Sequence, residues 1–221
     1  MKVLLFGATG MVGQSVLREC LLDPQVTSIT AVGRSVTGQQ HPKLHDIKHG
    51  ELLDLSAIEE RVQGFDACFF CLGVSSAGMS EAKYRELTYD LTLSIARTLA
   101  RLNPRMTFIY VSGSGTDSTE RGRSMWARVK GKTENDLLKL PFQAAYMFRP
   151  GAILPKNGVR SKTKLYQAIY DVMRPFYPLL ERGFKNGITT SEKLGRAMIN
   201  IVRQGYHTPF IESSDINKLG S

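Results

Sequence analysis

The sequence predicts an α/β fold, a doubly wound and mostly parallel sheet with a small C-terminal lobe. Strand-like apolar segments alternate with helix-length segments along the whole chain, which is typical of parallel βαβ units. The apolar run at residues 3–6 leads directly into a glycine-rich turn and a helix entry. Loops rich in Gly and Ser occupy residues 112–124 and 151–164. Loops at the carboxyl ends of parallel strands are where ligands bind in this architecture.

The elements follow in order along the chain. We expect strands near residues 2–7, 27–33, 46–53, 66–72, 106–112, 143–148 and 208–212. The first helix spans 11–22 and stops before Pro24, because proline cannot continue a helix. A second helix covers 80–102. The last clear helix has Ser191 as its cap and Gly205 just beyond its end.

Length and composition describe an ordinary globular chain of 221 residues. We expect a single domain, in which residues 1–150 form the core and residues 151–221 shape the substrate side. No apolar segment approaches the length of a membrane span, and the first residues lead into a strand instead of a signal sequence. We therefore predict a cytoplasmic protein without a membrane span.

The net charge and its distribution along the chain limit the kinds of partner that the protein can bind. The formal net charge is +9, and residues 151–221 carry 11 Lys and Arg against 5 Asp and Glu. This excess would attract an anionic cofactor, substrate or acidic partner, or it forms an ordinary solvated face. Aromatic residues are not interleaved with the basic ones as in nucleic-acid modules. We predict no nucleic-acid partner and no metal site.

The turn after the first strand carries the most informative motif, Gly7-Ala8-Thr9-Gly10-Met11-Val12-Gly13. Gly7 permits a tight turn, Gly10 lets a pyrophosphate approach, and Gly13 lets the helix pack closely on the strand. The phosphates would meet free N–H groups at the positive end of the helix. The motif predicts a Rossmann-type dinucleotide site formed by this turn. A plain strand–turn–helix is the alternative.

The residues after the second strand bear on the choice of cofactor. Enzymes that bind NAD usually place a carboxylate here for the ribose 2′-hydroxyl, whereas this chain has Arg34-Ser35. Arginine would pair with a 2′-phosphate. We predict NADP(H) in preference to NAD(H), with a solvated surface arginine as the alternative.

Two further stretches are expected to contact the cofactor. Asp54-Leu55, after the third strand, would meet the adenine edge, with Glu51 as a rival and a helix cap as the other role for Asp54. Cys71-Leu72-Gly73 follows the fourth strand, where the glycine would let the ribose approach the backbone.

The fifth strand delivers Ser112 at its carboxyl end, and Trp126 and Lys130 follow on one face of a helix. With the segments GATGMVG, VGR, CLG, YVSG, VKGKTE, FRPGAIL and AMINIV, the chain resembles the short-chain dehydrogenase/reductase superfamily along nearly its whole length. The resemblance is to the atypical branch around the Tat-interacting oxidoreductase-like proteins.

The resemblance implies a Ser–Tyr–Lys set for hydride-transfer chemistry. Ser112 matches the serine that hydrogen-bonds the substrate carbonyl. Lys130 matches the lysine that lowers the pKa of the tyrosine and holds the nicotinamide ribose. Pro150 and Gly151 match a stretch whose backbone passes the nicotinamide. Trp126 stands where the family has its general-acid tyrosine, and an indole has no proton to exchange near neutral pH.

Three functions follow from this departure. The chain is a reductase of an unknown carbonyl substrate, taking its proton from Lys130, a water, Ser114 or Tyr166. Alternatively, it is a redox-inactive NADP(H)-binding regulator or sensor, or it uses the nucleotide in a non-redox reaction. An apolar helical stripe at Leu165, Tyr166, Ile169, Tyr170 and Met173 would serve as core or as a dimer contact. A monomer and a homodimer are both compatible with the sequence.

Overall fold

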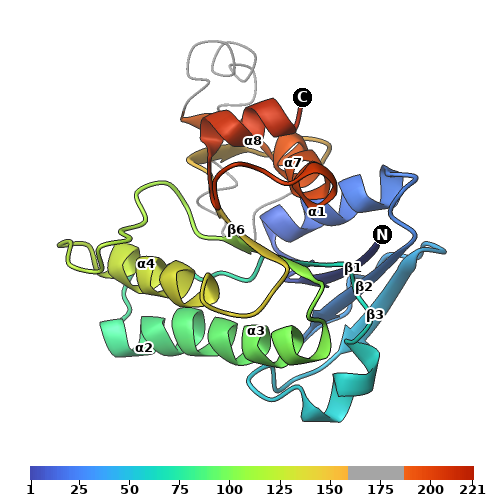
Figure 1. Ribbon diagram of the computed structural model, residues 1–221, viewed down its shortest axis with the longest axis horizontal. Coiled ribbons are helices and arrows are strands. Elements are labelled where there is room, and N and C mark those ends of the chain that lie inside the picture. Colours follow the sequence, from blue (N-terminus) through green and yellow to red (C-terminus); the bar gives the residue numbers. More distant parts are fainter. Residues whose placement is uncertain (159–186) are drawn as a thin grey trace.

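A computed structural model describes residues 1–158 and 187–221 of the chain (Figure 1). A seven-stranded sheet with the order β3-β2-β1-β4-β5-β6-β9 forms its centre, and every neighbouring pair is parallel. This order confirms the predicted doubly wound fold. The strands are β1 (Lys2–Phe6), β2 (Ser28–Gly33), β3 (Leu44–Lys48), β4 (Ala67–Phe70), β5 (Thr107–Val111), β6 (Ala144–Arg149) and β9 (Phe210–Glu212).

Helices cover both faces of the sheet, with α1, α7 and α8 on one side and α3 and α4 on the other (Figure 1). Strand β1 supplies both cores, because successive side chains of a strand point to opposite faces. Val3 and Leu5 lie in the core under α1, and Leu4 and Phe6 in the core under α3. The helices are α1 (Met11–Leu22), α2 (Glu81–Arg85), α3 (Leu91–Leu102), α4 (Met125–Leu137), α7 (Ser191–Gln204) and α8 (Ser213–Leu219), with a 3₁₀ turn at Ser56–Arg61 and a π turn at Glu86–Asp90 joining α2 to α3.

The first and last long helices lie side by side. Arg196 of α7 donates to the Glu19 carboxylate of α1 with an N–O distance of 3.2 Å, and Arg203 pairs with Asp23 at the end of α1. A Cβ on Gly195 would lie 2.8 Å from Cγ of Glu19. The close approach of the two helices therefore depends on glycine at this position.

The third strand differs from its prediction, since it covers residues 44–48 instead of 46–53. Leu52 lies within the predicted strand, but it is buried from irregular chain after β3, as is Leu55, which was expected just after the strand. The apolar pattern therefore indicated correctly that these residues are buried, but the backbone around them does not form a strand.

The cap of the last long helix also differs. Thr190 is the capping residue, because its hydroxyl accepts a hydrogen bond from the N–H of Lys193 at 3.2 Å. Ser191, the predicted cap, is the first helical residue, and its hydroxyl accepts from the N–H of Lys156 at 3.0 Å. Gly205 ends the helix with φ of 67°, as predicted.

Three short elements were not predicted. Strands β7 (Ala152–Leu154) and β8 (Ile188–Thr190) form a separate parallel pair, and α8 follows β9 directly. Elements of this length carry too few residues to show a period. The apolar stripe predicted over residues 165–173 lies outside the described residues.

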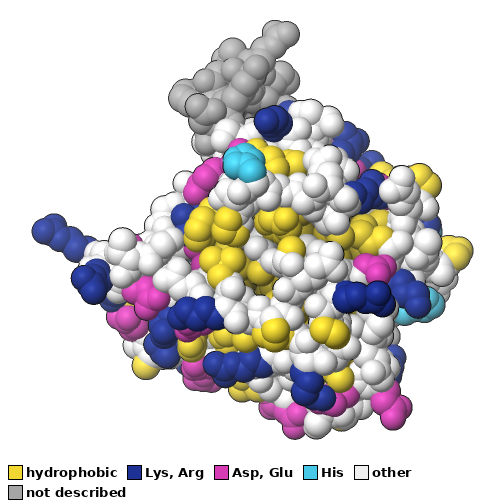
Figure 2. All heavy atoms as spheres, viewed as in Figure 1, with side chains coloured by type: hydrophobic (Ala, Val, Ile, Leu, Met, Phe, Trp, Pro, Cys, Tyr) yellow, Lys and Arg dark blue, Asp and Glu magenta, His cyan; other side chains and the backbone are white. Residues whose placement is uncertain are grey.

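On the face shown in Figure 2, Lys and Arg side chains are spread among acidic ones instead of forming one basic patch. Within the described ranges, no helix combines the length and the apolar character that crossing a bilayer requires.

Candidate functional site

The turn between β1 and α1 is shaped by close backbone contacts. Gly7 has φ of +82°, and a Cβ there would lie 2.7 Å from the Cys71 carbonyl carbon at the end of β4. A Cβ on Gly13 would lie 2.1 Å from the Gly7 carbonyl oxygen. Both glycines are therefore required by the packing of the protein itself. At Gly10 the nearest atom would be 3.4 Å away, so the space above this residue is open.

This open space faces the beginning of α1. Gly10 is the N-cap, and no side chain caps the helix. The first-turn N–H groups, which include those of Met11, Val12 and Gly13, have no partner within the helix and are available to an anion. The Thr9 carbonyl accepts from the Gln14 amide at 3.0 Å, which holds the turn against α1. The residues of the turn fit the pyrophosphate of a dinucleotide.

A pocket adjoins the turn at the ends of β1, β2 and β4. Its lining residues are Gly7, Ala8, Thr9, Ala31, Val32, Gly33, Arg34, Ser35, Leu52 and Leu72. The side chain of Arg34 is exposed and has no ion-pair partner among the described residues. No carboxylate lines the pocket in the described part of the chain. Asp46, the carboxylate on neighbouring β3, accepts from the N–H and hydroxyl of Thr37.

The residues predicted to meet the adenine do not line this pocket. Leu55 is buried in the core under α3, and Asp54 is exposed, accepting from the N–H of Ser56 at 2.8 Å. This hydrogen bond lowers the pKa of the Asp54 carboxyl. Glu51 accepts from the N–H of Leu53. Leu52 lines the pocket instead, and its apolar neighbourhood was the only signal for it in the sequence.

The stretch after β4 lies across the pocket from Arg34. Leu72 lines it, and the partly buried Cys71 packs against the core under α1. Gly73 is exposed, and a Cβ there would meet nothing within 4 Å. Burial raises the pKa of the Cys71 thiol to about 12, so this thiol is unreactive near neutral pH.

The end of β5 carries a hydrogen-bonded group that joins β5, α4 and β6. Ser112 is 5% exposed, and its hydroxyl donates to Oε1 of Glu134 at 2.5 Å. The Ser112 N–H donates to the Phe148 carbonyl at 2.9 Å, and the Ser112 carbonyl accepts from Nζ of Lys130. The structure thus brings Ser112 and Lys130 together, with the serine hydroxyl directed into the protein.

Glu134, which no sequence argument assigned a role, is fully buried one turn after Lys130 on α4. Arg149 at the end of β6 donates to it through Nε at 3.0 Å and through Nη2. The four-residue spacing from Lys130 was the available signal, since it places both side chains on one helical face. Burial lowers the pKa of Lys130 from its usual 10.5 to about 8, and the Glu134 carboxylate opposes part of this shift.

Trp126 lies in the first turn of α4 and packs on the loop after β5. The indole lies against Gly115, where a Cβ would be 3.5 Å from Cη2. Ser114, one residue before Gly115, is exposed, and its N–H donates to the Pro150 carbonyl at 2.9 Å. Among the described residues, nothing hydrogen-bonds its hydroxyl. Tyr166, the other hydroxyl named as a candidate proton donor, lies outside the described residues.

The backbone after β6 is held within the protein. The Pro150 carbonyl accepts from Ser114, and the N–H of Gly151 donates to the Ser213 hydroxyl at 2.8 Å. A Cβ on Gly151 would lie 2.2 Å from the Gly187 carbonyl oxygen. The stretch is placed beside the loop that carries Ser114.

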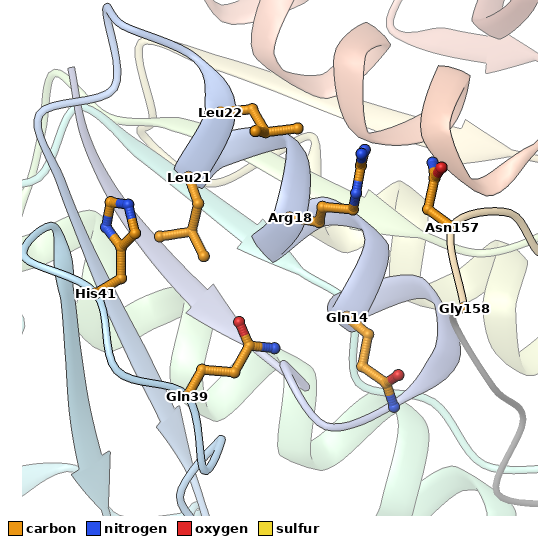
Figure 3. Close-up of a pocket in the computed structure, with 8 residues that line it drawn as sticks. All are labelled: Gln14, Arg18, Leu21, Leu22, Gln39, His41, Asn157 and Gly158. Atoms are coloured by element: carbon orange, nitrogen blue, oxygen red, sulfur yellow. The ribbon is translucent and has the colours of Figure 1, made fainter.

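A second pocket, of about 460 Å³, lies beside α1 (Figure 3). None of the predicted site residues lines it, and no motif in the sequence indicated it. Its lining residues are Gln14, Arg18, Leu21 and Leu22 of α1, Gln39 and His41 between β2 and β3, and Asn157 and Gly158 after β7.

The parallel sheet, the glycine turn and the pocket at the strand ends define a class: an NAD(P)-binding protein of the Rossmann fold. A family model described as the NAD binding domain of semialdehyde dehydrogenase matches residues 2–95.

Two relatives show more closely which proteins of this class the chain is similar to. Protein fmp52-2, mitochondrial, of Aspergillus terreus is 25% identical over 225 residues, covering 98% of this chain and 95% of the relative. Protein HTATIP2 of Rattus norvegicus is 26% identical over 156 residues, covering 69% and 67%. The chain is similar to the FMP52 and HTATIP2 proteins, and the predicted resemblance is confirmed.

Solved structures share the fold at lower identity. Uronate dehydrogenase from Agrobacterium tumefaciens has a TM-score of 0.67 and 15% identity, covering 95% of this chain and 74% of that one. The Bordetella bronchiseptica enzyme WbmF in complex with NAD+ has a TM-score of 0.66 and 15% identity, covering 98% and 76%.

The expectation of a cytoplasmic protein is overturned by the relatives. The FMP52 proteins of Aspergillus terreus, Emericella nidulans and Candida albicans are named mitochondrial. The reasoning failed because the lack of a secretory signal carries no information about import into an organelle.

Proposed function

We propose that the protein binds NADP(H) and reduces a carbonyl substrate. The observation that supports this most directly is the position of Lys130 at the end of β5, two strands from the glycine turn in the same parallel sheet. In parallel sheets of this kind, ligands bind at the carboxyl ends of the strands where the strand order reverses, which here lies between β1 and β4, with β5 as the next strand. Bound NADPH would supply the hydride.

The preference for NADP(H) rests on Arg34. Its guanidinium is exposed at the pocket rim, and no acidic side chain lines that pocket within the described ranges. A 2′-phosphate would satisfy this charge through a charge-assisted hydrogen bond, whereas a 2′-hydroxyl would not. Gly7, Gly10 and Gly13 with the first turn of α1 would hold the pyrophosphate.

The proton would come from Lys130. A pKa of about 8 leaves its ammonium group mostly protonated at neutral pH and close enough to the working pH to exchange a proton. Ser112 fixes this ammonium through its carbonyl oxygen, and the exposed Ser114 hydroxyl would bind the carbonyl oxygen of the substrate. The Trp126 indole would form a wall of the site.

The second candidate is a redox-inactive NADP(H)-binding sensor. Trp126 favours it, because the indole at the tyrosine position packs on Gly115 and has no exchangeable proton near neutral pH. In this function Lys130 and Arg34 would bind the cofactor without turnover. In both candidates we propose one functional unit, with residues 1–150 holding the cofactor and residues 151–221 shaping the substrate side.

The test is titration of the purified protein with NADPH and NADH, followed by a screen of carbonyl compounds that monitors NADPH oxidation. Trp126 is the sole tryptophan, so quenching of its emission by NADPH would report binding beside it. NADPH oxidation in the screen supports the reductase. Tight binding without turnover across a broad screen supports the sensor, and no binding of either dinucleotide contradicts both.

A further inference from the structure

Glu134 and Arg149 form a buried ion pair at the edge of the candidate site. Glu134 is fully buried, and the Arg149 side chain is 13% exposed. Each Glu134 oxygen accepts from the guanidinium, and Oε1 also accepts from the Ser112 hydroxyl. The carboxylate is therefore fully engaged, and it is closed off from solvent.

Arg149 extends the connections of the pair. Nη2 donates to the Ser118 hydroxyl at 2.5 Å, and Nη1 lies 3.6 Å from a carboxylate oxygen of Glu212. Its guanidinium carbon lies 4.4 Å from the centre of the Phe210 ring. The pair thus joins α4 to the ends of β5, β6 and β9 and to the loop after β5.

The free-energy cost of burying two charges indicates that this ion pair serves a purpose besides stability. Taking two charges out of water costs several kcal/mol per ion, and well-packed apolar residues in their place are often as stable or more so. In some proteins, what such a pair adds is a specific orientation of the groups around it. Here the group oriented is Ser112, whose hydroxyl, N–H and carbonyl are all engaged.

We propose that Glu134 and Arg149 are positioning residues for the candidate site. By holding the Ser112 hydroxyl inside the protein, the pair sets the Ser112 carbonyl to receive Lys130 and leaves Ser114 as the hydroxyl that faces the substrate. The charged groups around Lys130 are Glu134 on its own helix and, through that carboxylate, Arg149 of β6 and Glu212 of β9. The assignment of Ser114 rests on the proposed reductase function, whereas the control of Lys130 does not.

The pair is tested without cofactor or substrate by measuring how fast Lys130 is acetylated by acetic anhydride as pH rises, with mass spectrometry as readout. The wild type should reach half-maximal labelling near pH 8. Glu134→Gln removes the opposite charge and leaves Arg149 nearby, so we expect the midpoint to fall by about one pH unit. The labelling rate below the midpoint should then rise about tenfold.

The matched control is Glu19→Gln. Glu19 of α1 is also buried, at 4% exposure, and is paired with Arg18 of α1 and Arg196 of α7, on the opposite face of the sheet from α4. Its loss should leave the Lys130 midpoint unchanged. If Glu134→Gln gives the wild-type midpoint, or if both variants shift it equally, the proposal is overturned.

A buried charge left alone can prevent folding. The double variant Glu134→Gln with Arg149→Gln removes both charges and keeps hydrogen-bonding side chains, and circular dichroism will report whether it folds. We expect it to shift the midpoint in the same direction, and an unshifted midpoint contradicts the proposal. If the labelling result holds while no carbonyl compound is reduced, the reductase function fails and the positioning role stands.

Discussion

Arg34 offers the sharpest single test of cofactor choice. Arg34→Ala should weaken NADPH by about 1.5–3 kcal/mol, the cost of losing a charge-assisted hydrogen bond, and should leave NADH nearly unaffected. Calorimetric titration of both dinucleotides measures this. Arg97→Ala, at an exposed position on α3, should change neither affinity. Equal affinity of the wild type for NADPH and NADH would contradict the assignment.

Trp126 is where the chain departs from the family it resembles. In the sensor function, Trp126→Tyr should supply an acid beside Lys130 and raise carbonyl reduction by about 10²–10⁴-fold, the usual contribution of positioned acid catalysis. Trp126→Phe, which has no hydroxyl, is the control. Circular dichroism and NADPH affinity must be measured alongside, because the loop at Gly115 is packed on an indole. A wild type that already reduces the substrate rapidly, with Trp126→Tyr neutral or harmful, argues against a dormant site and for Lys130 as the acid.

Two glycines at the beginning of α1 allow dinucleotide binding to be tested separately from folding. Gly10→Ala places a methyl group 3.4 Å from its nearest neighbour, in the space assigned to the pyrophosphate, so the protein should fold and lose dinucleotide affinity. Gly13→Ala places one 2.1 Å from the Gly7 carbonyl oxygen and should destabilise the fold by about 1–3 kcal/mol or more through overpacking. Urea unfolding and NADPH titration of both variants distinguish the two effects. Loss of stability in Gly10→Ala equal to that in Gly13→Ala would contradict this reading of the turn.

Elements with strong local signals could be predicted from the sequence. Helix α1 has the predicted limits, because Pro24 and the glycine turn bound it on both sides. Strands β1, β2, β5 and β6 lie within a residue or so of their expected positions, since buried parallel strands are short, nearly continuous apolar runs. Strand β3 was predicted to extend too far, because Leu52, within the predicted range, is buried from irregular chain. Once a strand has ended, the local sequence pattern no longer shows which face of the sheet an apolar residue packs against.

The site could be predicted only in part for a related reason. The glycine turn and Arg34 are contiguous motifs, and the structure gathers them around one pocket. Glu134 and Arg149 are 15 residues apart and meet only because α4 returns along β5 and β6. The direction of the Ser112 hydroxyl depends on the contact between Glu134 and Arg149. The spacing of residues within a single helix or strand cannot predict such a contact.

The unfolding of the whole protein should depend on pH through Lys130. Burial disfavours its charged form, so between about pH 8 and 10.5 the folded protein binds fewer protons than the unfolded chain. Stability from this group therefore rises with pH across that window. At pH 7 the buried charge costs stability, and Lys130→Met should remove the cost. The stability advantage of Lys130→Met over the wild type should accordingly be largest at pH 7 and shrink toward pH 10.

Urea unfolding of the wild type and of Lys130→Met at several pH values measures the contribution of Lys130 alone. All other titratable groups are present in both proteins, so their contributions cancel in the difference. The buried thiols act in the opposite direction, since the unfolded chain releases their protons first above pH 9. Lys139→Met, at a side chain that is 73% exposed, should differ from the wild type by a pH-independent amount. A pH-independent difference for Lys130→Met as well would contradict the burial of its charge.

The packing of α7 on α1 sets a constraint on how the chain can fold during synthesis. The ion pairs that join these helices link residues 177 and 180 positions apart. Contacts so distant along the chain must close a very long loop, and folds dominated by them form slowly. Until α7 has been translated, the outer side of α1 has no cover, because the residues that cover it have not yet been made. Helix α1 is therefore completed long after its own synthesis, and until then its apolar surface is open to chaperones and to misassembly.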